Sequence, residues 1–236
     1  MQLSAPIYLL KHQAKRLARA GNLPLHKALD QVASREGYRG WSHLTASAQT
    51  GPAEAVMRHL TPGTLLVLAA RPGHGKTLLG LKLASEAARL NRRGFVFTLD
   101  YHHRDVEGRL TDIGVTGHNG LTVDTSDGIC ADHIVDQISK HTAPALVIVD
   151  YLQLLDQNRR HPHLNDQLGA LRQYADQTGT IFALISQIDR SFDLSGKEIP
   201  DITDLRQPNP FETDHFDAAC FLHNGRLNVT SLKAAP

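Results

Sequence analysis

The sequence predicts an α/β fold in which helices cover a mainly parallel sheet. Short segments rich in branched and aromatic residues alternate with segments of helical periodicity along most of the chain. The first apolar segment runs into a glycine-containing loop and then a helix. Apolar residues make up 41% of the 236, enough to fill one core. Such alternation places helices on both faces of a sheet and ligands at the carboxyl ends of its strands.

The alternating part is expected to hold five strands and four helices. The strands are predicted at residues 65–69, 95–99, 121–124, 145–149 and 180–185, and the helices at 77–91, 105–113, 131–141 and 164–178. A β-hairpin at the sheet edge should follow, with strands at 218–222 and 227–232 around the turn His223-Asn224-Gly225.

Residues 1–50 are expected to form a small helical extension before the main domain at residues 51–236. One helix should end at Gly21-Asn22, and a second should begin at Pro24 and end at Gly37, with Trp41 filling the small core. Lys and Arg side chains follow the first helix. They are either a solvated face, which is the commoner case, or a contact with nucleic acid or an acidic protein partner.

Composition and charge favour a soluble cytoplasmic protein. Lys and Arg number 25 against 24 Asp and Glu, so only a local patch could meet a polyanion. No leader peptide or membrane-length apolar run stands out. The two cysteines are expected as reduced thiols, and the histidine clusters lack the spacing of a metal site. These residues are Cys130, Cys220, His102, His103, His161 and His163.

Residues 65–77 have the pattern of a buried strand followed by a phosphate-binding loop. Gly73 and Gly75 would let backbone N–H groups face phosphates, Lys76 would bridge the β- and γ-phosphates, and Thr77 would hold Mg²⁺. Ala70 stands where the pattern G-x-x-x-x-G-K-[ST] has its first glycine, so the alternative is a turn that binds nothing. The predicted nucleotide-binding residues are Arg71, Pro72, Gly73, His74, Gly75, Lys76, Thr77 and Leu78.

Three further polar side chains follow predicted strands and complete a set for phosphoryl chemistry, together with Lys76. Asp150 is expected to hold Mg²⁺, although a strand-end Asp is also a common turn or cap residue. Asp100 is a candidate base for an attacking water, and its alternative role is to cap the helix that begins near residue 103 or 105. Gln187 could position water or contact a γ-phosphate, although surface glutamines are common.

Four segments together resemble the RecA-type ATPase domain of bacterial replicative DNA helicases, the DnaB class. They are residues 70–77, 146–155, 185–190 and 202–206, and the resemblance covers residues 60–233. The Asp-Tyr-Leu-Gln-Leu segment at 150–154 and the Asp-Leu-Arg segment at 204–206 are specific to that class. The resemblance implies a RecA-like fold with ATP and Mg²⁺ as ligands. The family accepts alanine at the position of Ala70, and the resemblance aligns Asp100 with the family's catalytic glutamate.

Two departures from the resembled family concern turnover and assembly. Asp100 is one methylene shorter than the family's glutamate, which could leave a water out of reach by about 1 Å and slow hydrolysis. The resemblance makes Lys233 an inter-subunit residue, but Ala235 stands where the family has an arginine finger. An oligomer is therefore allowed, whereas a closed hexameric motor is not expected.

The segment that resembles the family's DNA-facing loop also differs. Arg206, Gln207 and Asn209 are the predicted nucleic-acid contacts, with single-stranded DNA as the partner that the resemblance implies. Pro208 and Pro210 remove N–H donors that could have met phosphates. Two functions therefore stay open: a slow Mg²⁺-dependent ATPase associated with nucleic acid, and a module that binds ATP or ADP and signals to a protein through its N-terminal helices.

Overall fold

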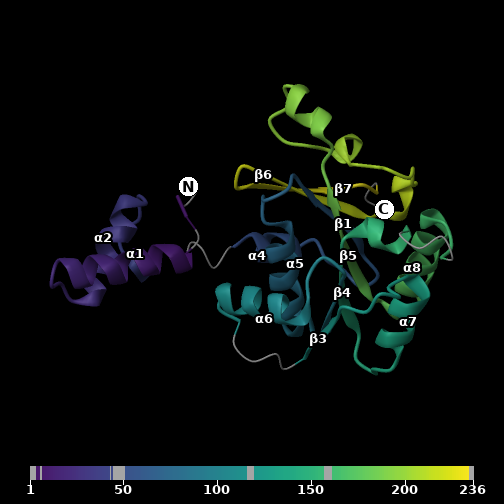
Figure 1. Cartoon of the computed structure of the whole chain (residues 1–236), viewed down its shortest axis with the longest axis horizontal. Helices are drawn as coiled ribbons and strands as arrows, with labels where there is room; N and C mark the ends of the chain where they lie inside the picture. The colour runs from purple at the N-terminus through teal and green to yellow at the C-terminus, as the bar shows by residue number, and fades with distance from the viewer. Residues whose placement is uncertain are drawn as a thin grey trace.

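The computed structural model describes residues 4–5, 7–42, 44, 51–115, 120–156 and 161–233. Figure 1 shows a central sheet with helices on both faces, and a pair of N-terminal helices that stands apart from it. No helix in the described residues combines the length and the apolar composition that crossing a membrane requires.

Seven strands of the described chain form one sheet in the order β3-β2-β4-β5-β1-β6-β7. Every neighbouring pair is parallel except β6 and β7, which form the predicted antiparallel hairpin at the edge. The predicted strands are confirmed with shifts of at most two residues at their ends. Their bounds are β1 Leu65–Ala70, β2 Arg93–Thr98, β3 Leu121–Asp124, β4 Ala145–Asp150, β5 Ile181–Gln187, β6 Ala218–His223 and β7 Arg226–Ser231.

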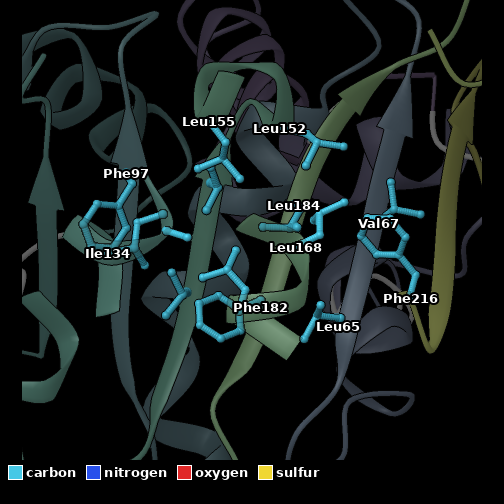
Figure 2. Close-up of a cluster of buried hydrophobic side chains, with 14 of the residues drawn as sticks. Leu65, Val67, Phe97, Ile134, Leu152, Leu155, Leu168, Phe182, Leu184 and Phe216 are labelled. Carbon is cyan, nitrogen blue, oxygen red and sulfur yellow. The ribbon is translucent and has the colours of Figure 1, made fainter. Parts of the chain in front are cut away.

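The central strands are apolar on both faces because each face is covered by helices. Every residue of β1 and β4 is buried. Alternate residues of the strands enter two separate cores, so that Val67 and Val149 lie in one and Leu68 and Ile148 in the other. In Figure 2, strand residues of the first core meet Ile134 of α7 (Ala131–Ser139) and Leu168 of α8 (Leu164–Thr178).

The second core lies under α4 (Pro52–Met57), α5 (Lys76–Ser85) and α6 (His103–Asp112). The prediction of a single helix at 77–91 is wrong: α5 ends at Ser85, and a short 3-10 helix, η1, follows at Ala87–Leu90. Asn91 then takes a left-handed conformation with φ of 53° and turns the chain into β2. The helix α4 was not predicted, because the residues 49–52 indicated only a boundary.

Gly94 lets α5 approach the sheet closely. A Cβ placed on Gly94 would lie 2.1 Å from the carbonyl oxygen of Ala84, a backbone atom that cannot swing aside. The close approach packs the last turn of α5 against the start of β2.

Between β5 and β6 the chain leaves the sheet in an excursion that the sequence did not predict. It contains three 3-10 helices: η3 (Arg190–Leu194), η4 (Ile202–Asp204) and η5 (Thr213–His215). The Lys197 ammonium lies 2.9 Å from carboxylate oxygens of both Asp201 and Asp204. A bridge between Ile188 and Leu205 returns the chain to the end of β5.

The N-terminal helices α1 (Ile7–Ala20) and α2 (Leu25–Arg35) have a core of their own. Asn22 and Gly37 take positive φ angles, 46° and 84°, at the two predicted helix ends. Trp41 packs against this core from its edge. The division of the chain at residue 50 stays a proposal.

Candidate nucleotide site

The predicted phosphate loop joins the end of β1 to the start of α5. Gly73 and Gly75 have φ angles of 81° and 88°, in the left-handed region where L residues with a side chain are strained. A Cβ at either position would meet nothing within 4 Å, so backbone conformation alone requires glycine there. Gly75 caps α5, whose first residues are Lys76 and Thr77, and the helix begins one residue earlier than predicted. The loop therefore opens at a helix N-terminus, a favourable place for phosphate oxygens.

The sheet brings the predicted polar residues to the same edge as this loop. Asp150, the last residue of β4, pairs with Thr98 at the end of β2. Gln187, the last residue of β5, pairs with Ala70 at the end of β1. Because parallel strands end at one edge, Asp150 of β4 and Gln187 of the neighbouring strand β5 both lie at the edge of the sheet from which the loop leaves β1.

The Asp150 carboxylate is 3% exposed and sits beside the start of α5. Burial raises the pKa of Asp150 to about 6, against the opposing effects of the Thr77 hydroxyl hydrogen bond and the Lys76 charge. One of its oxygens, Oδ2, is buried without a donor among the described residues. The peptide bond that follows, Asp150–Tyr151, is cis.

These groups fit a Mg²⁺ ion that is shared with a nucleotide. Mg²⁺ prefers hard oxygen ligands, and typically takes one or two protein groups together with substrate phosphates. The Thr77 hydroxyl and the unpaired Asp150 oxygen supply such groups. The described residues contain no cluster of three or more His, Cys, Asp or Glu side chains that could hold a metal alone.

Asp100 lies two residues beyond β2, near the same lysine. Burial raises the pKa of Asp100, and the charge of Lys76 opposes that shift. The alternative role as a helix cap is wrong: His102 caps α6, and its N–H donates to Asp105 at 3.2 Å. The position and raised pKa of Asp100 suit a group that accepts a proton near the phosphates.

Arg109, on the second turn of α6, is a site residue that the sequence did not predict. Its guanidinium carbon lies 4.1 Å from the centroid of the Tyr101 ring, a cation–π contact that holds the side chain beside the strand ends. The positive charge of Arg109 lowers the pKa of Asp150, so it acts on the buried carboxylate. No local sequence signal indicated this pairing, because the contact joins a loop residue to a helix residue eight positions later.

Gln187 is linked to Arg206 rather than standing alone. The Arg206 guanidinium donates to Gln187 Oε1 at 3.2 Å, and the Arg206 N–H donates to the Gln187 carbonyl at 2.8 Å. Gln153, which was not among the predicted site residues, donates from Nε2 to the Arg206 carbonyl at 2.9 Å. Arg206, which was predicted to contact nucleic acid, is therefore hydrogen-bonded to Gln187, which was predicted to contact the γ-phosphate.

Two side chains of the phosphate loop contact other parts of the chain. Arg71 makes a two-pronged ion pair with Asp193 of η3, at 2.8 and 3.2 Å, and also donates to the Ile188 carbonyl at 3.1 Å. His74 stacks on His223 at the end of β6. The side chain of Arg71 is therefore bonded to the excursion. This part of the loop can contact phosphates through its backbone.

The remaining predicted residues lie away from the loop. Lys233 pairs with Asp217 of the same chain at 2.6 Å, and an inter-subunit role stays a prediction. Gln207 and Asn209 are exposed on the excursion, beside Pro208 and Pro210. Ala235, at the expected place of the arginine finger, falls outside the described residues.

Comparison with known proteins decides the family. The sequence model of the DnaB-like helicase C terminal domain matches residues 113–233, just over half of the chain. The chain belongs to the DnaB-like helicase C-terminal domain family. The matched range contains Asp150, Gln187, Arg206 and Lys233, and begins after the phosphate loop, which therefore rests on its own motif and geometry.

Relatives and solved structures agree with this DnaB-like assignment. The Replicative DNA helicase DnaB of Helicobacter pylori is 25% identical over 199 residues, which cover 70% of this chain and 41% of the relative. The ATPase domain of G40P has a TM-score of 0.59 at 17% identity, covering 74% of this chain and 76% of that one. A DnaB-like replicative helicase, solved to study its interactions with primase, has a TM-score of 0.57 at 14% identity, covering 91% and 64%.

These comparisons confirm the predicted resemblance and the RecA-like fold. This DnaB-like chain spans about two fifths of the length of the helicase relative that it matches. The activity and partners of a whole helicase are therefore not carried over to it.

Proposed function

We propose that this chain binds ATP with Mg²⁺ and hydrolyses it slowly, in association with nucleic acid and without acting as a self-sufficient helicase motor. The observation that carries the proposal is the meeting of the positive-φ phosphate loop with the buried Asp150 carboxylate beside Thr77 and Lys76. Family membership supports the same chemistry and supplies the link to nucleic acid.

Each residue has a part in this proposal. Backbone N–H groups of residue 71 and residues 73–78, together with the Lys76 ammonium, bind the phosphates, while Thr77 and Asp150 would hold the ion. A bound Mg²⁺ would neutralise charge that develops on the phosphate oxygens. Asp100 accepts a proton from the attacking water. Gln187 contacts the γ-phosphate, and its hydrogen bonds with Arg206 couple that contact to Arg206.

A second candidate is a nucleotide-binding module with little hydrolysis. Two features favour it: the Asp100 side chain is shorter than a glutamate, and the side chain of Arg71 is engaged by Asp193. A module of this kind would bind ATP or ADP and signal to a partner through residues 1–50.

The test is nucleotide binding and phosphate release by the wild-type chain and two lysine variants. Lys76→Ala should abolish the rise in melting temperature that Mg²⁺–ATP produces, and should abolish phosphate release. Lys82→Ala is the matched control, because Lys82 lies on the same helix but pairs with Glu86 at 3.0 Å. Equal loss in both variants, or turnover in Lys76→Ala, would sink the site assignment. Binding without phosphate release would favour the module.

A further inference from the structure

The helix α1 presents a row of exposed basic side chains beside its buried face. Lys11, Lys15 and Arg19 are exposed and follow one another at intervals of four residues, about 6 Å along the helix axis. Leu10 and Ala14, on the neighbouring face, are fully buried in the core shared with α2. The basic face is therefore held in a fixed orientation by the small core beneath it.

The charges of this face have no carboxylate partner in the described part of the chain. Among the residues that the structure describes, Lys11, Lys15, Arg16 and Arg19 form no ion pair. Both carboxylates of the N-terminal segment are engaged elsewhere: Asp30 accepts the Trp41 N–H at 2.9 Å, and Glu36 accepts the Ser4 N–H at 2.6 Å. The cations of α1 thus keep their full attraction for an external anion.

The charge of the whole chain is divided unevenly between its two parts. Residues 1–50 contain seven Lys and Arg against two Asp and Glu, a net charge of +5. Residues 51–236 contain 18 against 22, a net charge of −4. The near-neutral total therefore hides a strongly basic helical pair.

We propose that the basic face of α1 binds the phosphate backbone of nucleic acid without reading its sequence. A protein interface usually has an apolar or aromatic centre and few lysines, whereas nucleic-acid interfaces are polar and positively charged. Binding to a membrane surface would require an exposed apolar face on α1, and α2 already covers that face. The proposal rests on the nucleic-acid association proposed above, and not on the nucleotide site.

This surface also compensates for the poor fit of the residues predicted to contact DNA. Arg206 is fastened to Gln187, and the two prolines that follow have no N–H to donate. The basic face of α1 supplies the positive charge that this loop lacks.

The experiment measures anisotropy of a labelled 30-nucleotide single strand and of a duplex of the same length, with the full chain and no nucleotide, from 50 to 200 mM NaCl. The test variant is Lys11→Gln/Lys15→Gln/Arg19→Gln. The control variant, Lys82→Gln/Lys140→Gln/Arg226→Gln, removes the same net charge from the main domain. Glutamine suits a helix surface, and surface ion pairs of the control contribute little, so both should fold.

The test variant should lose at least tenfold in affinity at 50 mM NaCl, and its slope of log affinity against log salt should fall by about 2 to 3, since each phosphate contact contributes about 0.7 to 0.9. The control should stay within twofold of the wild type. Lys15→Gln alone should lower the slope by about 0.7 to 0.9, which guards against an unfolded triple variant.

Three results would overturn the proposal: no binding by the wild type at 50 mM NaCl, equal losses in the test and control variants, or competition by polyglutamate as strong as that by unlabelled DNA. The last result would assign the face to an acidic protein instead. Lys76→Ala should bind DNA like the wild type, so a failure of the proposed ATPase leaves this result unaffected.

Discussion

His74 of the phosphate loop stacks on His223 of the last hairpin, with ring centroids 5.2 Å apart and planes 11° apart. The His74 Nδ1 atom also accepts the Asn224 N–H at 3.2 Å, and Phe192 packs edge-on against His223. The loop that is expected to hold phosphates is thus braced by a turn about 150 positions later in the chain.

His74→Ala should cost about 1 kcal/mol of unfolding free energy at pH 7.5, the typical contribution of an aromatic pair. Burial and the neighbouring His223 lower the pKa of His74, so its stabilising effect is present above pH 6.5 and is lost as the pH falls through the folded-state pKa. Urea unfolding at pH 7.5 and 5.5 checks this. His59→Ala, on an exposed histidine, is the control, and a wild-type advantage that grows toward acid would contradict the argument.

Asp150→Asn should make the ligand-free protein more stable at pH 7.5 while it abolishes nucleotide turnover. The pKa of Asp150 is raised from 3.8 to about 6, so the stability that its protonated form contributes is complete below about pH 4 and is lost as the pH rises through 6. The loss is up to about 3 kcal/mol, at about 1.4 kcal/mol per pH unit. The difference in unfolding free energy between variant and wild type should therefore widen from pH 4.5 to pH 7.5. A constant difference would show that Asp150 does not titrate in this range.

Arg109→Ala should raise the pKa of Asp150 further, because it removes a positive charge that favours the carboxylate. The midpoint of the pH dependence of Mg²⁺–ATP affinity should move to higher pH. Arg109→Lys keeps the charge but loses the planar stacking on Tyr101, so its midpoint should lie between those of the wild type and the alanine variant. Arg104→Ala, on an exposed arginine of the same helix, should leave the midpoint in place.

Asp100→Glu should increase phosphate release, by up to about 100-fold, since about 1 Å of misplacement can cost that much. The longer side chain would bring the carboxylate closer to the water that it activates. Single-turnover rates with saturating Mg²⁺–ATP are the measurement, and Asp112→Glu on α6 is the control. An unchanged rate would remove Asp100 from the catalytic residues.

Gly94→Ala should destabilise the protein by more than 2 kcal/mol, because the added methyl would overlap the Ala84 carbonyl and force α5 off the sheet. Gly108→Ala is the matched control: its Cβ would meet nothing within 4 Å on α6, so helix propensity should stabilise the protein by up to about 1 kcal/mol. Thermal unfolding of both variants measures the contrast. Similar melting temperatures would mean that the contact at Gly94 is relieved cheaply.

The fold could be predicted from local patterns because most elements carry them. The buried strands are short runs of branched residues, and α8 begins and ends at the predicted residues 164 and 178. The phosphate loop and the strand ends at Asp150 and Gln187 were found for the same reason. The loop follows an apolar run, Asp150 directly follows Val149, and Gln187 follows an apolar run with Ser186 between.

The contacts that complete the site had no such local signal. Arg109 reaches Tyr101, Gln153 reaches Arg206, and His74 reaches His223 only because tertiary packing brings them together. The excursion after β5 was missed because its 3-10 helices are too short to show a period. The predicted helix end near residue 91 corresponds to Asn91 at the end of η1, whereas no local signal marked the end of α5 at Ser85.

The unequal division of charge has a consequence for how the molecule moves. A +5 end and a −4 body on one chain form an electric dipole, and a field exerts a torque on a dipole even when the net charge is close to zero. Near a polyanion the protein should therefore rotate before contact, so that α1 faces the polyanion and the main domain points away from it (Figure 1). A total charge of +1 conceals a molecule with a preferred direction of approach.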